Sequence, residues 1–177
     1  MPEQGSQSGA QQASQDAQRH LAASVRHALE NLRAEAFVMT AAFDGARSGM
    51  RVLSAQLCSI EPLLVCVATR KGHVVEPLIR DSRCFALCAV AETDRLVLRK
   101  FPKDDSGGED DPFDAIAVQT LRTGAPVIAK SQMAFDCEVV RHFDLEADHE
   151  LYIGLVVDGR APDPPASAPD APATPEP

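Results

Sequence analysis

The stretch FVMTAAFDGARSGMRVLSAQLCSIEPLLVCV, residues 37–67, decides the fold of this chain. Apolar and β-branched runs alternate in it with the Gly-rich segment DGARSG at 44–49 and with the step SIEP at 59–62. Runs of this kind between turn residues are typical of β-strands. Gly45 and Gly49 let the chain turn sharply and let an anion approach the main chain closely. The stretch therefore predicts paired strands beside a turn that suits a bound phosphate.

The composition is that of one globular domain, because the chain has 177 residues and 45% of them are apolar. The net charge is −9 and no run of Lys and Arg interrupts it, so the protein would repel a phosphodiester backbone and no nucleic acid is expected as a partner. The longest apolar runs, such as LLVCVA at 63–68, are too short to cross a bilayer, and the N-terminus is polar. We therefore expect no membrane segment and a cytoplasmic protein.

The five cysteines fall inside apolar runs, are odd in number and form no CxxC pair. This pattern favours reduced thiols that pack as small hydrophobic side chains in a reducing compartment. His20 and His27 lie seven residues apart without a third ligand of fixed geometry, so they are expected to be solvated. No metal site is predicted.

Three segments differ in their capacity to bury apolar surface. Residues 1–14 are rich in Gln, Ser, Gly and Ala, and residues 161–177 form a Pro/Ala/Asp tail, so both ends are predicted to be disordered. Residues 15–160 are predicted to form the domain, which begins with an amphipathic helix over 16–33.

From residue 37 onward the pattern is that of short strands. Segments 73–80, 94–101 and 113–121 predict short helices or turns between them. Strands outnumber helices long enough to serve as crossovers, which favours an antiparallel barrel with peripheral α-helices over a parallel sheet. Six strands are predicted, at 37–43, 50–57, 63–69, 84–91, 133–143 and 152–157.

Two loops are distinctive. The acidic run PKDDSGGEDDP at 102–112 lacks the ligand spacing and the distal Glu of an EF-hand, so it is predicted to be a mobile surface loop. The segment DLEADH at 144–149 is predicted to join the last two strands as a hairpin, with solvated acids and with His149 at the start of the final strand.

The chain lacks the local signatures of hydrolases, zinc proteases, P-loop proteins and Rossmann domains. Anion binding by backbone and side-chain donors remains. Arg51, Ser54 and Ser59 offer a fixed charge and hydroxyls, and the patch TRKGH at 69–73 precedes a short helix whose N-terminal amides, together with Lys71, would attract a phosphate. A solvated basic turn is the alternative interpretation of this second patch.

Eight residues or short motifs follow one another along the chain, and their order and spacing, taken together, are specific for one family. They are Thr40, Gly45, Gly49 to Ser54, Cys58 to Val65, Phe85 to Cys88, Thr123 to Pro126, Asp136 to Glu138, and Asp148 to Val156. Over about residues 36–159 the chain resembles the flavin reductase-like, FMN-binding split-barrel family. The resemblance implies a mainly β fold, a six-stranded antiparallel Greek-key split barrel with peripheral α-helices, usually a homodimer, that binds FMN in a basic, hydroxyl-lined pocket.

The resemblance also implies the site residues. His149 matches the histidine of the family's Gly-Asp-His step and would lie where the nicotinamide stacks. The chain departs from the family at Arg51 and Leu53, which stand where Thr and Ser are common, so two hydroxyls are absent and Arg51 could contact phosphate instead. The residues implied to bind the cofactor are Met50, Arg51, Val52, Leu53, Ser54 and Ser59 along the flavin, and Lys71, Gly72 and His73 near its phosphate or ribityl chain.

By this resemblance the protein would be a flavoprotein oxidoreductase. It would act as an NAD(P)H-dependent FMN reductase that transfers hydride from nicotinamide C4 to flavin N5, with NADH or NADPH as co-substrate and with a partner monooxygenase as a candidate recipient of reduced flavin. Two alternatives stay open: a non-catalytic FMN-binding or interaction protein on the same barrel, and an oxidase of the pyridoxamine phosphate type.

Overall fold

The computed structural model describes residues 36–102 and 111–160. The helix predicted at 16–33, both predicted disordered ends and most of the acidic loop lie outside the described residues. None of the helices in the described part is long and apolar enough to cross a membrane.

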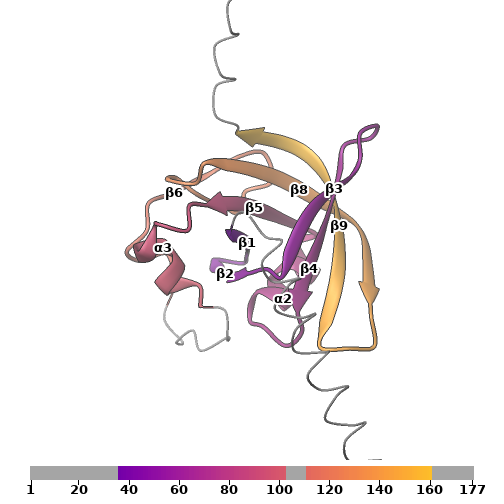
Figure 1. Cartoon of the computed structure of the whole chain (residues 1–177), viewed down its shortest axis with the longest axis horizontal. Coiled ribbons are helices and arrows are strands. Elements are labelled where there is room, and N and C mark those ends of the chain that lie inside the picture. The colour runs from indigo at the N-terminus through magenta and orange to yellow at the C-terminus, as the bar shows by residue number, and fades with distance from the viewer. Residues whose placement is uncertain (1–35, 103–110, 161–177) are drawn as a thin grey trace, which may run out of the picture. The chain divides into compact units, whose positions relative to one another are not determined.

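Seven strands form one antiparallel sheet in the order β2-β1-β5-β8-β9-β4-β3, which confirms the mainly β antiparallel fold (Figure 1). A separate two-stranded sheet pairs β6 with β7. The strands are β1 (Ala36–Phe43), β2 (Ala46–Arg51), β3 (Ser54–Ser59), β4 (Leu64–Arg70), β5 (Cys84–Val90), β6 (Val118–Thr120), β7 (Pro126–Ile128), β8 (Met133–Asp144) and β9 (His149–Arg160).

The prediction of one strand over 50–57 is wrong in one respect: the chain forms two strands there, because β2 ends at Arg51 and β3 begins at Ser54. The Val52 amide donates to the Phe37 carbonyl at 3.0 Å, whereas the next amide, that of Leu53, donates to the Ala68 carbonyl at 2.9 Å. Two consecutive amides therefore bond β1 and β4, each of which is the second strand from one end of the sheet order. This crossing joins the two edges of the sheet covalently, which explains why one sheet curls into a split barrel.

The other predicted strands are confirmed, with shifted ends. The final strand is twelve residues long; it begins at His149, as the hairpin prediction places it, and so extends beyond the segment predicted at 152–157, and it pairs along β8 through two register shifts. The segment 113–121, predicted as a helix or turn, instead ends in the short strand β6. Isolated three-residue strands carry too little periodicity to be identified from sequence.

The turn between β1 and β2 confirms the predicted role of Gly45 and contradicts that of Gly49. Asp44 and Gly45 both have positive φ, at 48° and 80°, as a two-residue hairpin turn requires. Gly49 instead lies buried within β2, where an added Cβ would stand 2.9 Å from Phe101 and 3.0 Å from the Thr40 side chain. A packed side chain, not an anion, explains this glycine.

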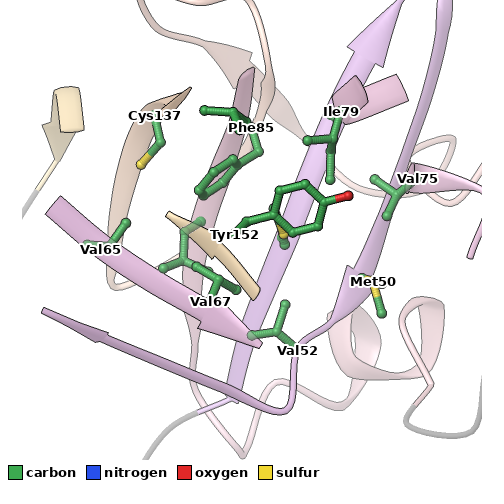
Figure 2. Close-up of a cluster of buried hydrophobic side chains, with 13 residues drawn as sticks. Met50, Val52, Val65, Val67, Val75, Ile79, Phe85, Cys137 and Tyr152 are labelled. Carbon is green, nitrogen blue, oxygen red and sulfur yellow. The ribbon is translucent and has the colours of Figure 1, made fainter. Parts of the chain in front are cut away.

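Two helices cover parts of the sheet. Helix α2 (Val75–Ser82) places Val75 and Ile79 in the main core cluster, and helix α3 (Arg95–Lys100) starts at Asp94, whose carboxylate accepts from the Val97 amide at 3.2 Å. Figure 2 shows the main cluster, in which Tyr152 from β9 packs with side chains of β1, β2, β4, β5, β8 and α2. The residues labelled there are Met50, Val52, Val65, Val67, Val75, Ile79, Phe85, Cys137 and Tyr152.

The cysteines are free thiols in the structure. Cys84, Cys88 and Cys137 are buried as predicted, and burial raises the pKa of Cys88 to about 11 and that of Cys137 to about 12. Cys58 departs from the prediction because its position on the edge strand β3 leaves it exposed.

Candidate functional site

The crossing between β2 and β3 holds five of the predicted cofactor-binding residues. The side chains of Met50 and Val52 point into the core cluster, so only their backbones could meet a ligand. The amides of Val52 and Leu53 are already bonded to Phe37 and Ala68, which corrects the expectation that this strand offers open amides. Leu53 and Ser54 are exposed.

Two buried side-chain atoms near this crossing, Arg51 Nε and Thr69 Oγ1, have no hydrogen-bond partner. Within residues 36–102 and 111–160, these are the two buried side-chain nitrogen or oxygen atoms that lack one. Thr69 is only 1% exposed and follows Ala68, the residue that bonds Leu53. An unpaired buried donor is costly, so such groups call for an explanation such as a ligand. A cationic group and a hydroxyl are the chemistry that a phosphate or an anionic ring edge requires.

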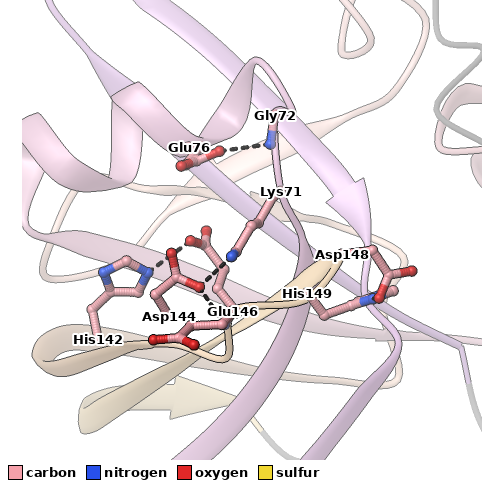
Figure 3. Close-up of polar contacts among 9 residues, drawn as sticks. Lys71, Gly72, Glu76, His142, Asp144, Glu146, Asp148 and His149 are labelled. Carbon is pink, nitrogen blue, oxygen red and sulfur yellow. Dashed lines mark hydrogen bonds and ion pairs between the residues drawn. The ribbon is translucent and has the colours of Figure 1, made fainter.

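The predicted phosphate patch at the end of β4 is occupied by the protein's own groups (Figure 3). Lys71 forms an ion pair with Asp144, and the Gly72 amide donates to Glu76 Oε2 at 2.8 Å. The hydrogen bond from Lys71 holds the pKa of Asp144 below its usual range, helped by the Glu146 amide. Carboxylates thus stand where an external phosphate was predicted.

His73 is also engaged by a group of the chain itself. Its Nδ1 accepts from the Val75 amide at 3.0 Å, so it caps the first turn of α2. The N-terminal amides of α2 are therefore partly engaged from within the chain. The helix has no side-chain hydrogen bond from its N-cap residue Val74.

His149 lies beside this patch. It pairs with Arg70 across the β4–β9 ladder, and the adjacent Lys71 amide donates to the Asp148 carbonyl at 3.1 Å. His149 Nδ1 stands 3.0 Å from Asp148 Oδ1, and this hydrogen bond lowers the pKa of Asp148. The structure therefore brings His149 to the same end of β4 as Lys71 and Thr69, as Figure 3 shows for His149 and Lys71.

Ser59 lies apart from the predicted site residues at the end of β4. It pairs with Leu64 at the far end of the β3–β4 ladder, whereas Ser54 pairs with Ala68 near the crossing. Five residues of extended strand separate the two serines by about 16 Å. One compact ligand head cannot contact both hydroxyls.

A family model described as the flavin reductase like domain matches residues 29–171. The chain belongs to this family. The flavin reductase-like family binds flavin, and its members are mostly oxidoreductases.

Named relatives fit this assignment. The NADPH-flavin oxidoreductase of Streptomyces viridifaciens is 27% identical over 124 residues, which cover 70% of this chain and 64% of that protein. A diflavin flavoprotein of Nostoc sp. is 28% identical over 145 residues, which cover 81% of this chain. The flavin reductase-like chain spans 25% of the length of that relative.

A solved structure shares the fold. It is a homologue of nitrilotriacetate monooxygenase component B from Mycobacterium thermoresistibile, with a TM-score of 0.68 and 23% identity, and the match covers 82% of this chain and 80% of that one. An identity this low shows the fold alone.

Sequence reasoning missed a polar cluster on the inner face of the flavin reductase-like barrel. Glu150 is 3% exposed and its Oε2 lies 2.7 Å from His142 Nε2, while burial and a hydrogen bond to Glu150 raise the pKa of Tyr152. The alternation of buried residues at 150, 152 and 154 was the available signal, but it becomes visible only once β9 is known to begin at His149.

Proposed function

We propose that this chain is an NAD(P)H-dependent flavin reductase that uses FMN and takes hydride from NADH or NADPH. Family membership supports the reaction class. The observation that carries the assignment to this chain is the pair of buried, unpartnered donors, Arg51 Nε and Thr69 Oγ1, beside the β2–β3 crossing.

Arg51 and Thr69 fit a flavin mononucleotide because they offer a fixed charge and a hydroxyl from β2 and β4, the two strands whose neighbouring residues bracket the crossing. The exposed Ser54 hydroxyl lies between them in the chain and would add a third donor. A bound flavin would supply the ring that accepts hydride. The role of the protein is then to hold that ring, orient the co-substrate and keep donors fixed before reaction.

His149 would orient the nicotinamide co-substrate. An ionised Asp148 can only accept hydrogen bonds, so Nδ1 of His149 carries the proton and Nε2 is the nitrogen left to face a ligand. Arg70, its exposed cross-strand neighbour, lies close enough to attract an anionic nucleotide.

Lys71 would contribute less to FMN affinity than Arg51, because a phosphate must first displace Asp144 from Lys71. Arg51→Gln should therefore weaken FMN binding about tenfold or more, as loss of a charge-assisted hydrogen bond does. Lys71→Ala should weaken it by a smaller factor. Equal losses would contradict this ranking, and unchanged affinity in both variants would show that FMN lies elsewhere.

Spectroscopy of the purified chain tests the reaction. The protein is loaded with FMN, and NADH or NADPH is added without oxygen while the flavin absorbance is followed. Bleaching with either donor is the expected result, and His149→Gln should slow it with little change in FMN affinity. A bound flavin that stays oxidised with both donors excludes the reductase.

A non-catalytic FMN-binding protein is the second candidate. It is favoured by the contacts at the end of β4, because Lys71 and the Gly72 amide already bind carboxylates of the chain itself. The same anaerobic titration separates the two candidates, since this alternative binds FMN without bleaching.

The assembly and the partner belong to the same proposal. We expect a homodimer that passes reduced flavin to a monooxygenase. Sedimentation of the full chain measures the first, and oxygenase turnover with this chain as the reductant source measures the second.

A further inference from the structure

A pocket of about 410 Å³ opens between helix α2 and the β8–β9 hairpin. This size is ordinary for a small-molecule site. The lining does not include Arg51 or Thr69, although it includes Gly72 and His73, which the family resemblance places near the FMN phosphate or ribityl chain. It is lined by Gly72, His73, Val74, Glu76, Pro77, Ile79, Arg80, Arg83, Val139, His142 and Tyr152.

One wall of the pocket is a pair of stacked rings. The His142 and Tyr152 rings lie 4.6 Å apart between centroids, at an interplanar angle of 22°. Glu150, buried behind them, fixes the His142 ring through Nε2. The His142 side chain is 41% exposed, whereas Tyr152, Ile79 and Val139 are at most 8% exposed, so the His142 ring is the flat platform that the pocket offers to a ligand.

Arg83 brings a positive charge to the lining. Its φ of 59° is left-handed, a conformation that helix ends usually assign to Gly or Asn. Its amide donates to the Ile79 carbonyl at 2.9 Å, its carbonyl accepts from the Val139 amide at 2.9 Å, and its guanidinium reaches the Val139 carbonyl at 3.4 Å. Three bonds thus hold Arg83 at the pocket, and no carboxylate in the described part of the chain pairs with it.

The other charged groups of the lining are engaged. Arg80 is bonded to its neighbour Asp81 at 2.9 Å, and the Glu76 carboxylate accepts from the Gly72 amide. Arg83, which is exposed, is therefore the arginine of the lining whose guanidinium is left to pair with an anionic ligand.

We infer that this pocket is a second ligand site, which binds a small aromatic carboxylate. The carboxylate would accept from Arg83, and the ring would lie against the His142–Tyr152 stack. A flat apolar body is needed to use the platform, and a single anionic group is needed to match the single unpaired guanidinium. The inference does not depend on the proposed reductase activity.

The composition of the chain supplies a reporter for this site. Tyr152 is the one tyrosine of the sequence, which also has no tryptophan. Full-length protein containing 3-fluorotyrosine should give a single ¹⁹F resonance from the pocket wall. Benzoate should shift it saturably with a dissociation constant of about a millimolar, as a ligand of this size allows. A linear, unsaturated shift, or an equal response to neutral benzamide, would overturn the inference.

Arg83→Gly is the informative variant, because glycine relaxes the left-handed position and the fold should survive. Benzoate affinity should fall about tenfold or more. Arg99→Gln, which removes an exposed arginine of α3 outside the pocket, is the matched control and should leave the affinity unchanged. Unchanged affinity in a folded Arg83→Gly protein would refute the role of Arg83.

Repeating the titration with saturating FMN tests whether the site is separate. The benzoate shift should persist. Its abolition by FMN would show that the pocket is part of the nucleotide site and would refute a second site.

Discussion

Replacing Thr69 by valine should make the flavin-free protein more stable and bind flavin more weakly. Thr69 is buried and its hydroxyl has no hydrogen-bond partner, so the folded chain carries the desolvation cost of that group. Such a cost is about 1–3 kcal/mol. Valine has nearly the same shape and no hydroxyl, so Thr69→Val should raise the free energy of unfolding by up to this amount.

Thr40→Val is the matched control. Thr40 is also fully buried, on the inner part of β1, but its hydroxyl donates to the Pro126 carbonyl and lies 3.4 Å from the Ala86 carbonyl. Removing this hydroxyl deletes a made hydrogen bond and leaves a buried acceptor with one partner fewer. Thr40→Val should therefore lower the free energy of unfolding by about 1–3 kcal/mol.

Urea denaturation of the flavin-free proteins gives the free energies of unfolding, and FMN titration gives the affinities. If the Thr69 hydroxyl meets the flavin, its loss should weaken FMN binding by about 0.5–1.5 kcal/mol, or about two- to thirteenfold. A destabilised Thr69→Val protein with unchanged FMN affinity would refute the reasoning, because it would mean that the hydroxyl is satisfied within the protein and does not face the ligand.

Three further outcomes are expected. Asp144→Asn should lower the melting temperature at pH 7, because a carboxyl group with a lowered pKa stabilises the fold above its usual value of 3.8 and loses that effect when it is protonated. The difference from the parent protein should therefore vanish as the pH falls below 4, and a difference that persists at pH 2 would contradict the ion pair. Gly154→Ala should lower the free energy of unfolding by about 1–3 kcal/mol, because the new Cβ would stand 2.5 Å from Phe85 Cζ. Adding Phe85→Leu should recover part of this loss when the variants are compared by denaturation. Iodoacetamide at pH 8 should alkylate exposed Cys58 well before Cys137, whose pKa burial raises to about 12, and equal rates by mass spectrometry would show that the barrel opens readily.

Local patterns were sufficient to locate most strands. The segments that became β1, β4, β5 and β8 contain apolar runs bounded by turn or charged residues, and these are properties of the chain itself. The break at Val52 and Leu53 was not predictable, because the backbone there looks like one extended run. It is a break only because consecutive amides find carbonyls on different strands, Phe37 and Ala68, which are far apart in sequence.

Gly49 shows the same limit within a single residue. A glycine in a Gly-rich turn region suggests backbone freedom or ligand approach, whereas its neighbour in space is Phe101, fifty-two positions away by their numbers. Which side chain fills the space above a glycine is a property of packing and has no local signature.

For the candidate site, the sequence by itself determined which residue types could meet an anion and placed His149 at the start of the last strand, because hairpin ends and helix starts are local features. Which of those groups are available depends on contacts between distant segments. Lys71 forms an ion pair with Asp144, and the Gly72 amide donates to Glu76. The Arg51 Nε and the Thr69 hydroxyl have no partner, and Ser59 lies at the far end of the β3–β4 ladder. Hydrogen bonds and ion pairs between distant segments fix these outcomes, and their partners are chosen by the closure of the barrel rather than by neighbours in the chain.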